Sequence, residues 1–243
     1  MEEAAGLVMT ALYERGMLRT WYRDRPEGWT LVSGQWSPIY LQLRELCSHP
    51  DVLTDVGVAL AALLDKDQPR PQRLVGVALG GIPVAIATSL ASGVPALMTR
   101  KLAARTKAGA AEELQQYGQH AAVEGRIEAG DQLLLVDDLV TRFDSKLIAA
   151  RQVQHEIDRR GLEGVSCSDV LVVVDREQGG ADAALEAGFT LRSLIRLKSQ
   201  GMDLLRPHLS ATEYDVVCSY LSDPAAFQSV DVQRQLRVVA EAG

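Results

Sequence analysis

The stretch QLLLVDDLVTRFDSKLIAARQVQHEIDRRG, residues 132–161, joins a short apolar run to a long amphipathic segment. The apolar run meets two adjacent acids, Asp137 and Asp138, and the amphipathic segment runs from Asp144 to Gly161. A continuous apolar strand followed by such a helix is typical of a parallel sheet whose two faces are both covered. The stretch therefore predicts one strand–turn–helix unit of an α/β protein.

The same pattern recurs on both sides of this unit. RLVGVAL (73–79) precedes GGIPVAIATSLASG (80–93), PALMTR (95–100) is another apolar run, and SDVLVVVD (168–175) precedes GADAALEAG (180–188). The repetition predicts a doubly wound parallel sheet built from right-handed crossovers. Ligands of such sheets bind outside the carboxyl ends of the strands, so the residues after each apolar run are the candidates for function.

We expect a single domain over residues 1–243 that has three consecutive parts. The first part, 1–50, holds a helix at 4–15 and a hairpin or two short strands within 29–43, and we call it the hood. The α/β core, 51–198, opens with a helix at 51–65 and contains a long mobile loop at 101–126, partly helical around 110–116. A helical extension, 199–243, contains a helix at 211–221 that Ser210 caps.

The composition predicts a folded protein of the cytoplasm. The chain is 47% hydrophobic and 23% charged, and 32 acidic against 25 basic residues give a net charge of −7, which does not favour nucleic acid as a partner. No run approaches the roughly 18 apolar residues that cross a bilayer, so we expect no membrane partner. The N-terminus lacks the features of a secretory signal, and three widely spaced cysteines favour a reducing compartment.

Five stretches resemble the orotate phosphoribosyltransferases, which belong to the type I phosphoribosyltransferases, and they occur in that family's order. The resemblance implies transfer of ribose 5-phosphate from phosphoribosyl pyrophosphate to orotate, which gives orotidine monophosphate and pyrophosphate in pyrimidine biosynthesis. It also implies Mg²⁺ bound mainly through the substrates, and a homodimer. The stretches are WTLVSGQWSPIYLQLR (29–44), GVALGGIPVA (76–85), Arg100-Lys101, YGQHAAVEG (117–125) and VVVDREQGG (172–180).

The resemblance assigns roles to individual residues, each of which also has a purely structural interpretation. Asp137 and Asp138 would hold the ribose hydroxyls and face the developing cation, although one could be a capping acid and the other a salt-bridge partner. Arg176 would contact the orotate ring and its carboxylate, or form a surface salt bridge. The remaining expected contacts are Leu79, Gly80 and Gly81 (pyrophosphate loop, or an ordinary strand-to-helix turn), Arg100 and Lys101 (pyrophosphate, or solvated charge), Thr141, Arg142 and Ser145 (5′-phosphate), and Ser33 and Tyr40 (substrate).

The sequence departs from the family where phosphate should bind. The family has small residues after the threonine, whereas Arg142, Phe143 and Asp144 stand here, so we expect a large side chain and a negative charge in the phosphate site. The family lysines are also absent, since Val32 occupies one position and Gln115 or Ala104 the other. Arg105, Lys107, His120 or Arg142 could substitute for the missing cations.

Two other functions remain open at this stage. One is a non-catalytic protein that keeps a pyrimidine or nucleotide pocket around Arg176, and the other is a phosphoribosyltransferase with a different acceptor. The extension resembles the linker of bifunctional uridine monophosphate synthases, but no Asp-x-Lys-x-x-Asp motif follows it. We therefore expect no decarboxylase activity in this chain.

Overall fold

The computed structural model describes residues 2–31, 33–65, 69–102 and 121–242. The chain divides into two compact units rather than three consecutive parts. Leu46–Leu194 forms the core unit, whereas Glu2–Glu45 and Ile195–Gly243 together form the second unit. The hood and the extension, at opposite ends of the sequence, therefore belong to one body.

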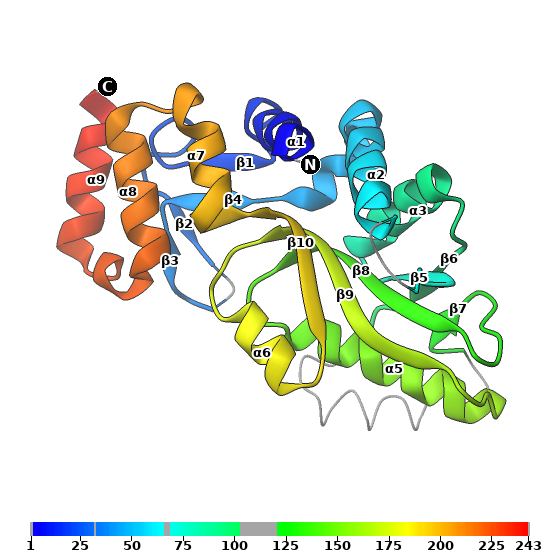
Figure 1. The fold of residues 1–243 in the computed structure, drawn as a ribbon. Coiled ribbons are helices and arrows are strands. Elements are labelled where there is room, and N and C mark those ends of the chain that lie inside the picture. The colour runs from blue at the N-terminus through cyan, green and yellow to red at the C-terminus, as the bar shows by residue number, and fades with distance from the viewer. Residues whose placement is uncertain (1, 32, 66–68, 103–120, 243) are drawn as a thin grey trace. The chain divides into compact units, whose positions relative to one another are not determined.

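The core unit is built on a six-stranded sheet with the order β10-β9-β8-β5-β6-β7 (Figure 1). Strand β5 pairs parallel with both β6 and β8, β8 pairs parallel with β9, and β7 pairs antiparallel with β6. The predicted parallel sheet is confirmed, and the sequence analysis missed β7 and β10. The strands are β5 Arg73–Gly76, β6 Ala96–Thr99, β7 Val123–Glu124, β8 Gln132–Val140, β9 Ser166–Asp175 and β10 Thr190–Arg196.

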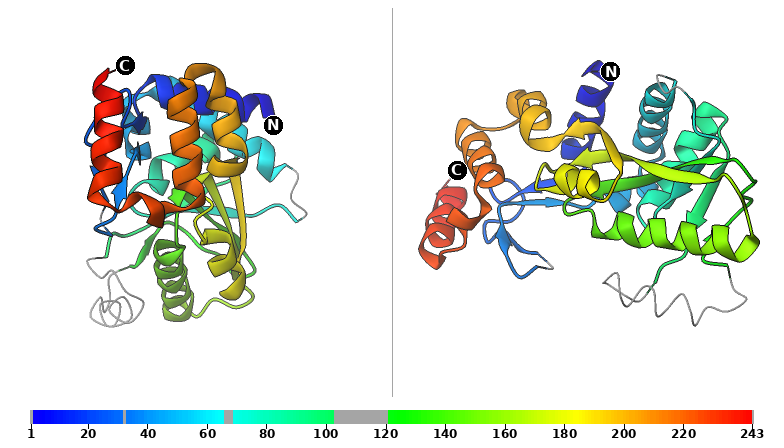
Figure 2. Two further views of the ribbon diagram at one scale, coloured as in Figure 1. Left: turned by 90° about the vertical axis from the view of Figure 1, so that its left-hand side faces the viewer. Right: turned by 60° about the horizontal axis from the view of Figure 1, so that its bottom comes forward.

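Helices cover both faces of this sheet, as a doubly wound fold requires. Helices α2 (Pro50–Leu64) and α3 (Gly81–Ser92) pack together on one face, and α5 (Asp144–Arg160) lies on the other (Figures 1 and 2). The short helix α6 (Gly180–Glu186) joins the α5 side, where its Ala184 belongs to the same apolar cluster as Val153 of α5. The predicted helix at 51–65 is confirmed within one residue at each end, whereas 103–120 lies outside the described residues.

The second unit consists of short strands and helices from both ends of the chain. Helix α1 is Glu2–Glu14, β1 (Leu18–Thr20) pairs antiparallel with β4 (Ile39–Leu41), and β2 (Trp29–Thr30) pairs with β3 (Trp36–Ser37), which confirms the hairpin expected within 29–43. Ser210 caps α8 by accepting a hydrogen bond from the backbone N–H of Glu213, also as expected. The remaining elements are η1 Leu43–Ser48, η2 Leu197–Gly201, α7 Met202–Leu205, η3 Arg206–His208, α8 Ala211–Ser222, η4 Pro224–Phe227 and α9 Val230–Ala242.

Side chains of the extension bond directly to the hood. The Gln228 amide accepts from the backbone N–H of Trp36 at 2.9 Å and donates to its carbonyl at 3.1 Å. The indole N–H of Trp21 donates to the carbonyl of Leu236, and the Thr20 hydroxyl donates to the buried carboxylate of Glu213. These bonds explain why both segments fold as one unit. No helix in the described part of the chain combines the length and apolarity needed to span a membrane.

Candidate functional site

The two adjacent acids lie in the last half of β8, at the carboxyl edge of the sheet. The strand continues through them to Val140, so their side chains leave it on opposite faces. Leu133 and Leu135, which share the face of Asp137, belong to the apolar core beneath α5. Asp138 lies on the other face, toward α3. Both carboxylates nevertheless reach the loop that precedes α3: Asp138 lies against Gly80, and Asp137 Oδ1 would lie 2.9 Å from a Cβ added at Gly81.

That loop is the predicted pyrophosphate loop, and it lies against Asp138. A Cβ added at Gly80 would overlap the Asp138 carboxylate, and one at Gly81 would overlap the backbone of β8. The peptide bond between Ala78 and Leu79 is cis, and the N–H of Ala78 donates to the Thr99 hydroxyl at 2.9 Å. The two glycines thus permit close approach of the loop to the acid.

The carboxyl of Asp138 has a raised pKa, about 7. Burial is the largest cause, followed by the negative charge of Asp137 and a hydrogen bond with it, whereas Lys146 and the N–H of Leu139 act in the opposite direction. The acid therefore gains or loses its charge near neutral pH.

The basic pair lies at the end of β6, beside the same loop. Its residues line a small cavity of about 50 Å³ together with the pyrophosphate loop and the start of α5. Arg100 Nε lies 2.7 Å from Glu124 Oε1, and the pair is half-exposed. The structure thus brings together elements that are far apart in sequence. Of the residues that line the cavity, Arg100, Lys101 and Ser145 are the ones that the sequence predicted for the site.

The expectation that Phe143 fills the phosphate site is wrong. Its side chain is only 1% exposed and lies in the apolar core, with its ring 5.6 Å from that of Phe189. The backbone reaches this position with a positive φ of 69°, which turns the side chain inward just before α5 begins. Arg142 and Asp144 are exposed, so the charge of Asp144 is solvated rather than enclosed.

Arg176 lies immediately after β9, next to the end of β8. It is only 7% exposed, so it is not a solvated surface side chain. Its backbone N–H donates to the carbonyl of Val140 at 3.1 Å. A Cβ at Gly180 would meet Val140 and Thr141, so the loop after β9 packs against the phosphate-loop region. Arg176 is therefore near the candidate phosphate loop.

Sequence reasoning missed one charged residue of the site, Lys146. Its Nζ lies 2.8 Å from Asp137 Oδ2, and the two side chains are 3% and 8% exposed. One signal could have revealed it, because Lys146 shares a helical spacing with Ala149, Val153 and Ile157, which are all buried. A lysine on the apolar face of a helix requires a buried partner.

The other predicted positions lie in the second unit or outside the described residues. Ser33 and Tyr40 belong to the second unit, where Ser33 is exposed and Tyr40 stacks on Trp29 with ring centroids 5.8 Å apart. The positions discussed for the missing lysines and their substitutes lie outside the described residues: Val32, Ala104, Arg105, Lys107, Gln115 and His120.

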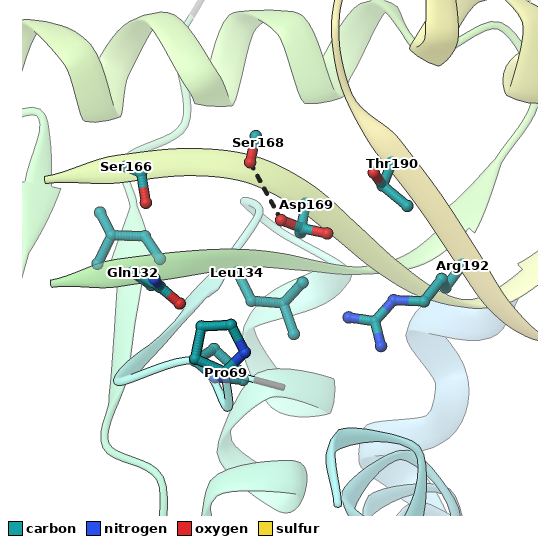
Figure 3. Close-up of a pocket in the computed structure, with 10 residues that line it drawn as sticks. Pro69, Gln132, Leu134, Ser166, Ser168, Asp169, Thr190 and Arg192 are labelled. Carbon is teal, nitrogen blue, oxygen red and sulfur yellow. Dashed lines mark hydrogen bonds between the residues drawn. The ribbon is translucent and has the colours of Figure 1, made fainter. Parts of the chain in front are cut away.

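A larger pocket of about 450 Å³ lies elsewhere in the core unit (Figure 3). It is lined by residues at the amino ends of β8 and β9, including Gln132 and Ser166, and by Asp169 and Arg192. Because the acids lie toward the carboxyl end of β8, this pocket is distinct from the candidate site.

Within the described residues, no group of three or more His, Cys, Asp or Glu side chains could hold a metal ion. Asp137 is already paired with a lysine, and Asp138 lies against Gly80 of the pyrophosphate loop. This donor set suits a divalent cation held mainly by substrate oxygens and water, and it does not suit a metal cage made by the protein.

The parallel sheet, the glycine loop after β5 and the acidic pair on β8 define a type I phosphoribosyltransferase. The solved structure of the Leishmania donovani UMP synthase supports this fold, with a TM-score of 0.72 at 24% identity over 91% of this chain and 43% of that one. No family profile matches the chain.

Two relatives of known name show which family of these transferases the chain belongs to. The orotate phosphoribosyltransferase of Halobacterium salinarum is 31% identical over 165 residues, which are 68% of this chain and 82% of that protein. The Caenorhabditis elegans uridine 5′-monophosphate synthase is 32% identical over 173 residues, and the chain spans only 31% of its length. The chain belongs to the orotate phosphoribosyltransferase family, whose members are transferases.

Proposed function

We propose that this chain is an active orotate phosphoribosyltransferase, making orotidine monophosphate and pyrophosphate from orotate and phosphoribosyl pyrophosphate. One observation carries the proposal: the Asp138 carboxylate lies against Gly80 of the pyrophosphate loop. The small cavity that contains the basic pair borders the same loop. The groups that would contact the sugar and the leaving group are therefore adjacent, although the sequence of the phosphate loop differs from that of the family.

The reaction needs fixed charges rather than a protein nucleophile. The bond between ribose and pyrophosphate weakens as positive charge develops on the sugar, and the anionic Asp138 would stabilise that charge. The backbone of residues 79–81, with Arg100 and Lys101, would hold the departing pyrophosphate. Arg176 would pair with the carboxylate of orotate and hold its ring in line with the sugar.

The altered phosphate loop is compatible with this role. Because Phe143 points into the core, its ring does not fill the space at the N-terminus of α5. Helix N-termini bind phosphate through free backbone N–H groups, and Ser145 and Arg142 are exposed beside this one. The repulsion between the exposed Asp144 carboxylate and a bound phosphate costs only ~1 kcal/mol when water screens it.

The direct experiment measures orotidine monophosphate formation by the whole chain with orotate, phosphoribosyl pyrophosphate and Mg²⁺. We expect turnover, and in Arg176→Ala a KM increase for orotate larger than the increase for phosphoribosyl pyrophosphate. Uracil in place of orotate tests whether the acceptor needs a carboxylate. Binding of orotate without turnover would instead indicate a non-catalytic pyrimidine-binding protein.

A Mg²⁺ ion that enters with the substrate would neutralise part of the negative charge of the pyrophosphate. We expect EDTA to abolish turnover and added Mg²⁺ to restore it. The Tm of the ligand-free protein should not change with Mg²⁺, because a substrate-held ion has no site in the free protein. A rise in Tm with Mg²⁺ alone would contradict substrate-held binding.

A homodimer is the assembly that we propose, formed through α2 and α3. Between these helices lies an apolar groove of about 520 Å³, lined by Leu53, Val58, Ile86 and Leu90 among others. Val58 is 57% exposed and Leu90 is 84% exposed. Exposed apolar side chains in a contiguous groove are typical of a protein interface, and a second copy presents a matching surface.

Replacement Leu90→Glu tests the dimer. We expect the variant to elute as a monomer in size-exclusion chromatography with light scattering, whereas the wild type elutes as a dimer. Asp55→Arg is the control, because Asp55 is exposed on α2 and does not line the groove. A dimer that persists in Leu90→Glu would place the interface elsewhere.

We further propose a cytoplasmic location and small-molecule partners rather than nucleic acid. The net charge of −7 supports the second point. All three cysteines are free, and Cys47 is exposed, which is compatible with a reducing compartment.

A further inference from the structure

Lys146 and Asp137 form a buried ion pair between α5 and β8. Lys146 Nζ is 2.8 Å from Asp137 Oδ2, and neither side chain is more than 8% exposed. The ammonium also donates to the backbone carbonyl of Leu139 and to the Ser145 hydroxyl, the latter at 3.3 Å. One side chain thus connects the acidic strand to the first turn of the phosphate-loop helix.

These contacts leave Lys146 no capacity to bind phosphate. A lysine ammonium has three N–H donors, and Asp137, Leu139 and Ser145 supply three acceptors. A phosphate contact would have to break one of these bonds inside a site that is almost closed to solvent. Lys146 is therefore not a replacement for the family cations that are absent from residues 101–126.

The same contacts separate Asp137 from its neighbour Asp138. Asp137 is buried and pairs through Oδ2 with Lys146 of α5 while its Oδ1 lies near Gly81, whereas the partly exposed Asp138 lies against Gly80. Asp137 also accepts a hydrogen bond from the backbone N–H of Asp138 at 2.9 Å, which orients the peptide that carries Asp138. The two acids are adjacent in sequence, but their surroundings differ.

We propose that Lys146 and Asp137 act together as positioning residues that join the end of β8 to the start of α5, and that Asp138 alone is the acid that contacts the sugar. The inference rests on the proposed function. It assigns Asp137 a different role from the one expected from the sequence. It also gives this chain an internal cation at the point where its phosphate-loop sequence departs from the family.

A double-mutant cycle tests the pair in the full-length protein. The variants are Lys146→Met, Asp137→Asn and the double variant, and the measurements are Tm, kcat, and KM for phosphoribosyl pyrophosphate. Each single change leaves a buried charge without its partner, so we expect both to lower Tm and to raise KM. The double variant should recover Tm, and its kcat/KM should exceed that of Lys146→Met by about tenfold, because the two effects are coupled.

The outcomes separate the possible failures. A double variant with wild-type Tm but the same KM increase as Asp137→Asn would show that the Asp137 carboxylate contacts substrate, which overturns the inference. If the wild type makes no orotidine monophosphate, the proposed function fails. In that case the Tm values of the three variants still test the ion pair. If the Tm decreases of the two single variants add up in the double variant, the inference is overturned. If Lys146→Met does not fold, a double variant no more stable than Asp137→Asn would overturn it.

Discussion

At the residue scale, Asp138 is the acid whose ionisation should control activity. Burial and the charge of Asp137 raise its pKa to about 7, from a usual value of 3.8. Between these two pH values the folded protein holds a proton that the unfolded chain has lost. The contribution of Asp138 to the free energy of unfolding therefore declines as pH rises through this window, and the acid is anionic above it.

The pH profile of kcat/KM should report this ionisation. We expect kcat/KM to rise with pH to an inflection near 7 and then to level off, because only the anion stabilises positive charge on the sugar. Asp138→Asn should lower kcat about 100-fold, as loss of a charge-stabilising group does in other enzymes, and should remove the inflection. Ionisation of the substrate itself is common to both proteins, so an unchanged inflection in the variant would assign the pKa to the substrate.

Gly80 offers a second test at this scale. A methyl group there would overlap the Asp138 carboxylate, so Gly80→Ala must displace either the loop or the acid. We expect KM for phosphoribosyl pyrophosphate to rise strongly in steady-state kinetics. The control is Gly6→Ala in α1, where a Cβ would only touch Leu204 at 3.6 Å and where alanine favours the helix. If Gly80→Ala and Gly6→Ala change the kinetics equally, the close approach of Gly80 to Asp138 is not important for substrate binding and the prediction is wrong.

At the element scale, α5 organises the site along its length. Its first turn borders the phosphate loop, and two turns later Gln152 donates to the carbonyl of Arg100 at 2.8 Å and to that of Ala122 at 3.3 Å. Glu156, one turn further on, accepts from the N–H of Ala122 at 3.1 Å. The helix thus holds the chain on both sides of residues 103–120, immediately next to the basic pair.

Gln152→Ala should therefore weaken the binding of phosphoribosyl pyrophosphate by Arg100 and Lys101. The amide is 2% exposed, and its removal leaves two carbonyls without this donor, which costs about 1–3 kcal/mol. We expect a lower Tm and a KM for phosphoribosyl pyrophosphate raised several-fold, with KM for orotate less affected. Gln154→Ala is the matched control, since Gln154 is exposed on the same helix and its amide donates to Asp158 one turn away at 2.8 Å. An unchanged KM in Gln152→Ala would show that α5 does not position Arg100.

At the scale of the whole molecule, the chain folds as two units that can be followed separately. All three tryptophans, Trp21, Trp29 and Trp36, belong to the second unit. Tryptophan fluorescence therefore reports unfolding of the second unit, whereas far-UV circular dichroism reports both. The bonds of Gln228 to Trp36 place one of these fluorophores at the junction of the hood with the extension.

Replacement Gln228→Ala should destabilise the second unit. The change removes two hydrogen bonds to the backbone of Trp36, so we expect a lower midpoint when urea unfolding is followed by tryptophan fluorescence. Gln235→Ala is the control, because Gln235 is exposed on α9. If both variants unfold at the wild-type midpoint, the Gln228 contacts contribute nothing to holding the extension.

Much of the core was predictable from the sequence, because its signals are local. Apolar runs followed by amphipathic segments predicted β5, β6, β8, β9 and the helices after them, and their order predicted which loops meet at the carboxyl edge of the sheet. The glycines at 80 and 81 lie where the sequence placed them, at the turn between β5 and α3. Strand β10 was missed because its run, TLRSLIR, mixes charge with apolar residues and has no continuous pattern.

The sequence by itself thus determined the α/β class, the position of the glycine loop after β5 and the membership of a transferase family, since each depends on short motifs in a fixed order. The tertiary structure alone decided three points: the burial of Phe143, the pairing of Asp137 with Lys146, and the union of the hood with the extension. All three depend on where a side chain points and what lies opposite it. A backbone angle at Phe143, the alternation of faces along β8, and contacts across nearly two hundred residues leave no local pattern in the sequence.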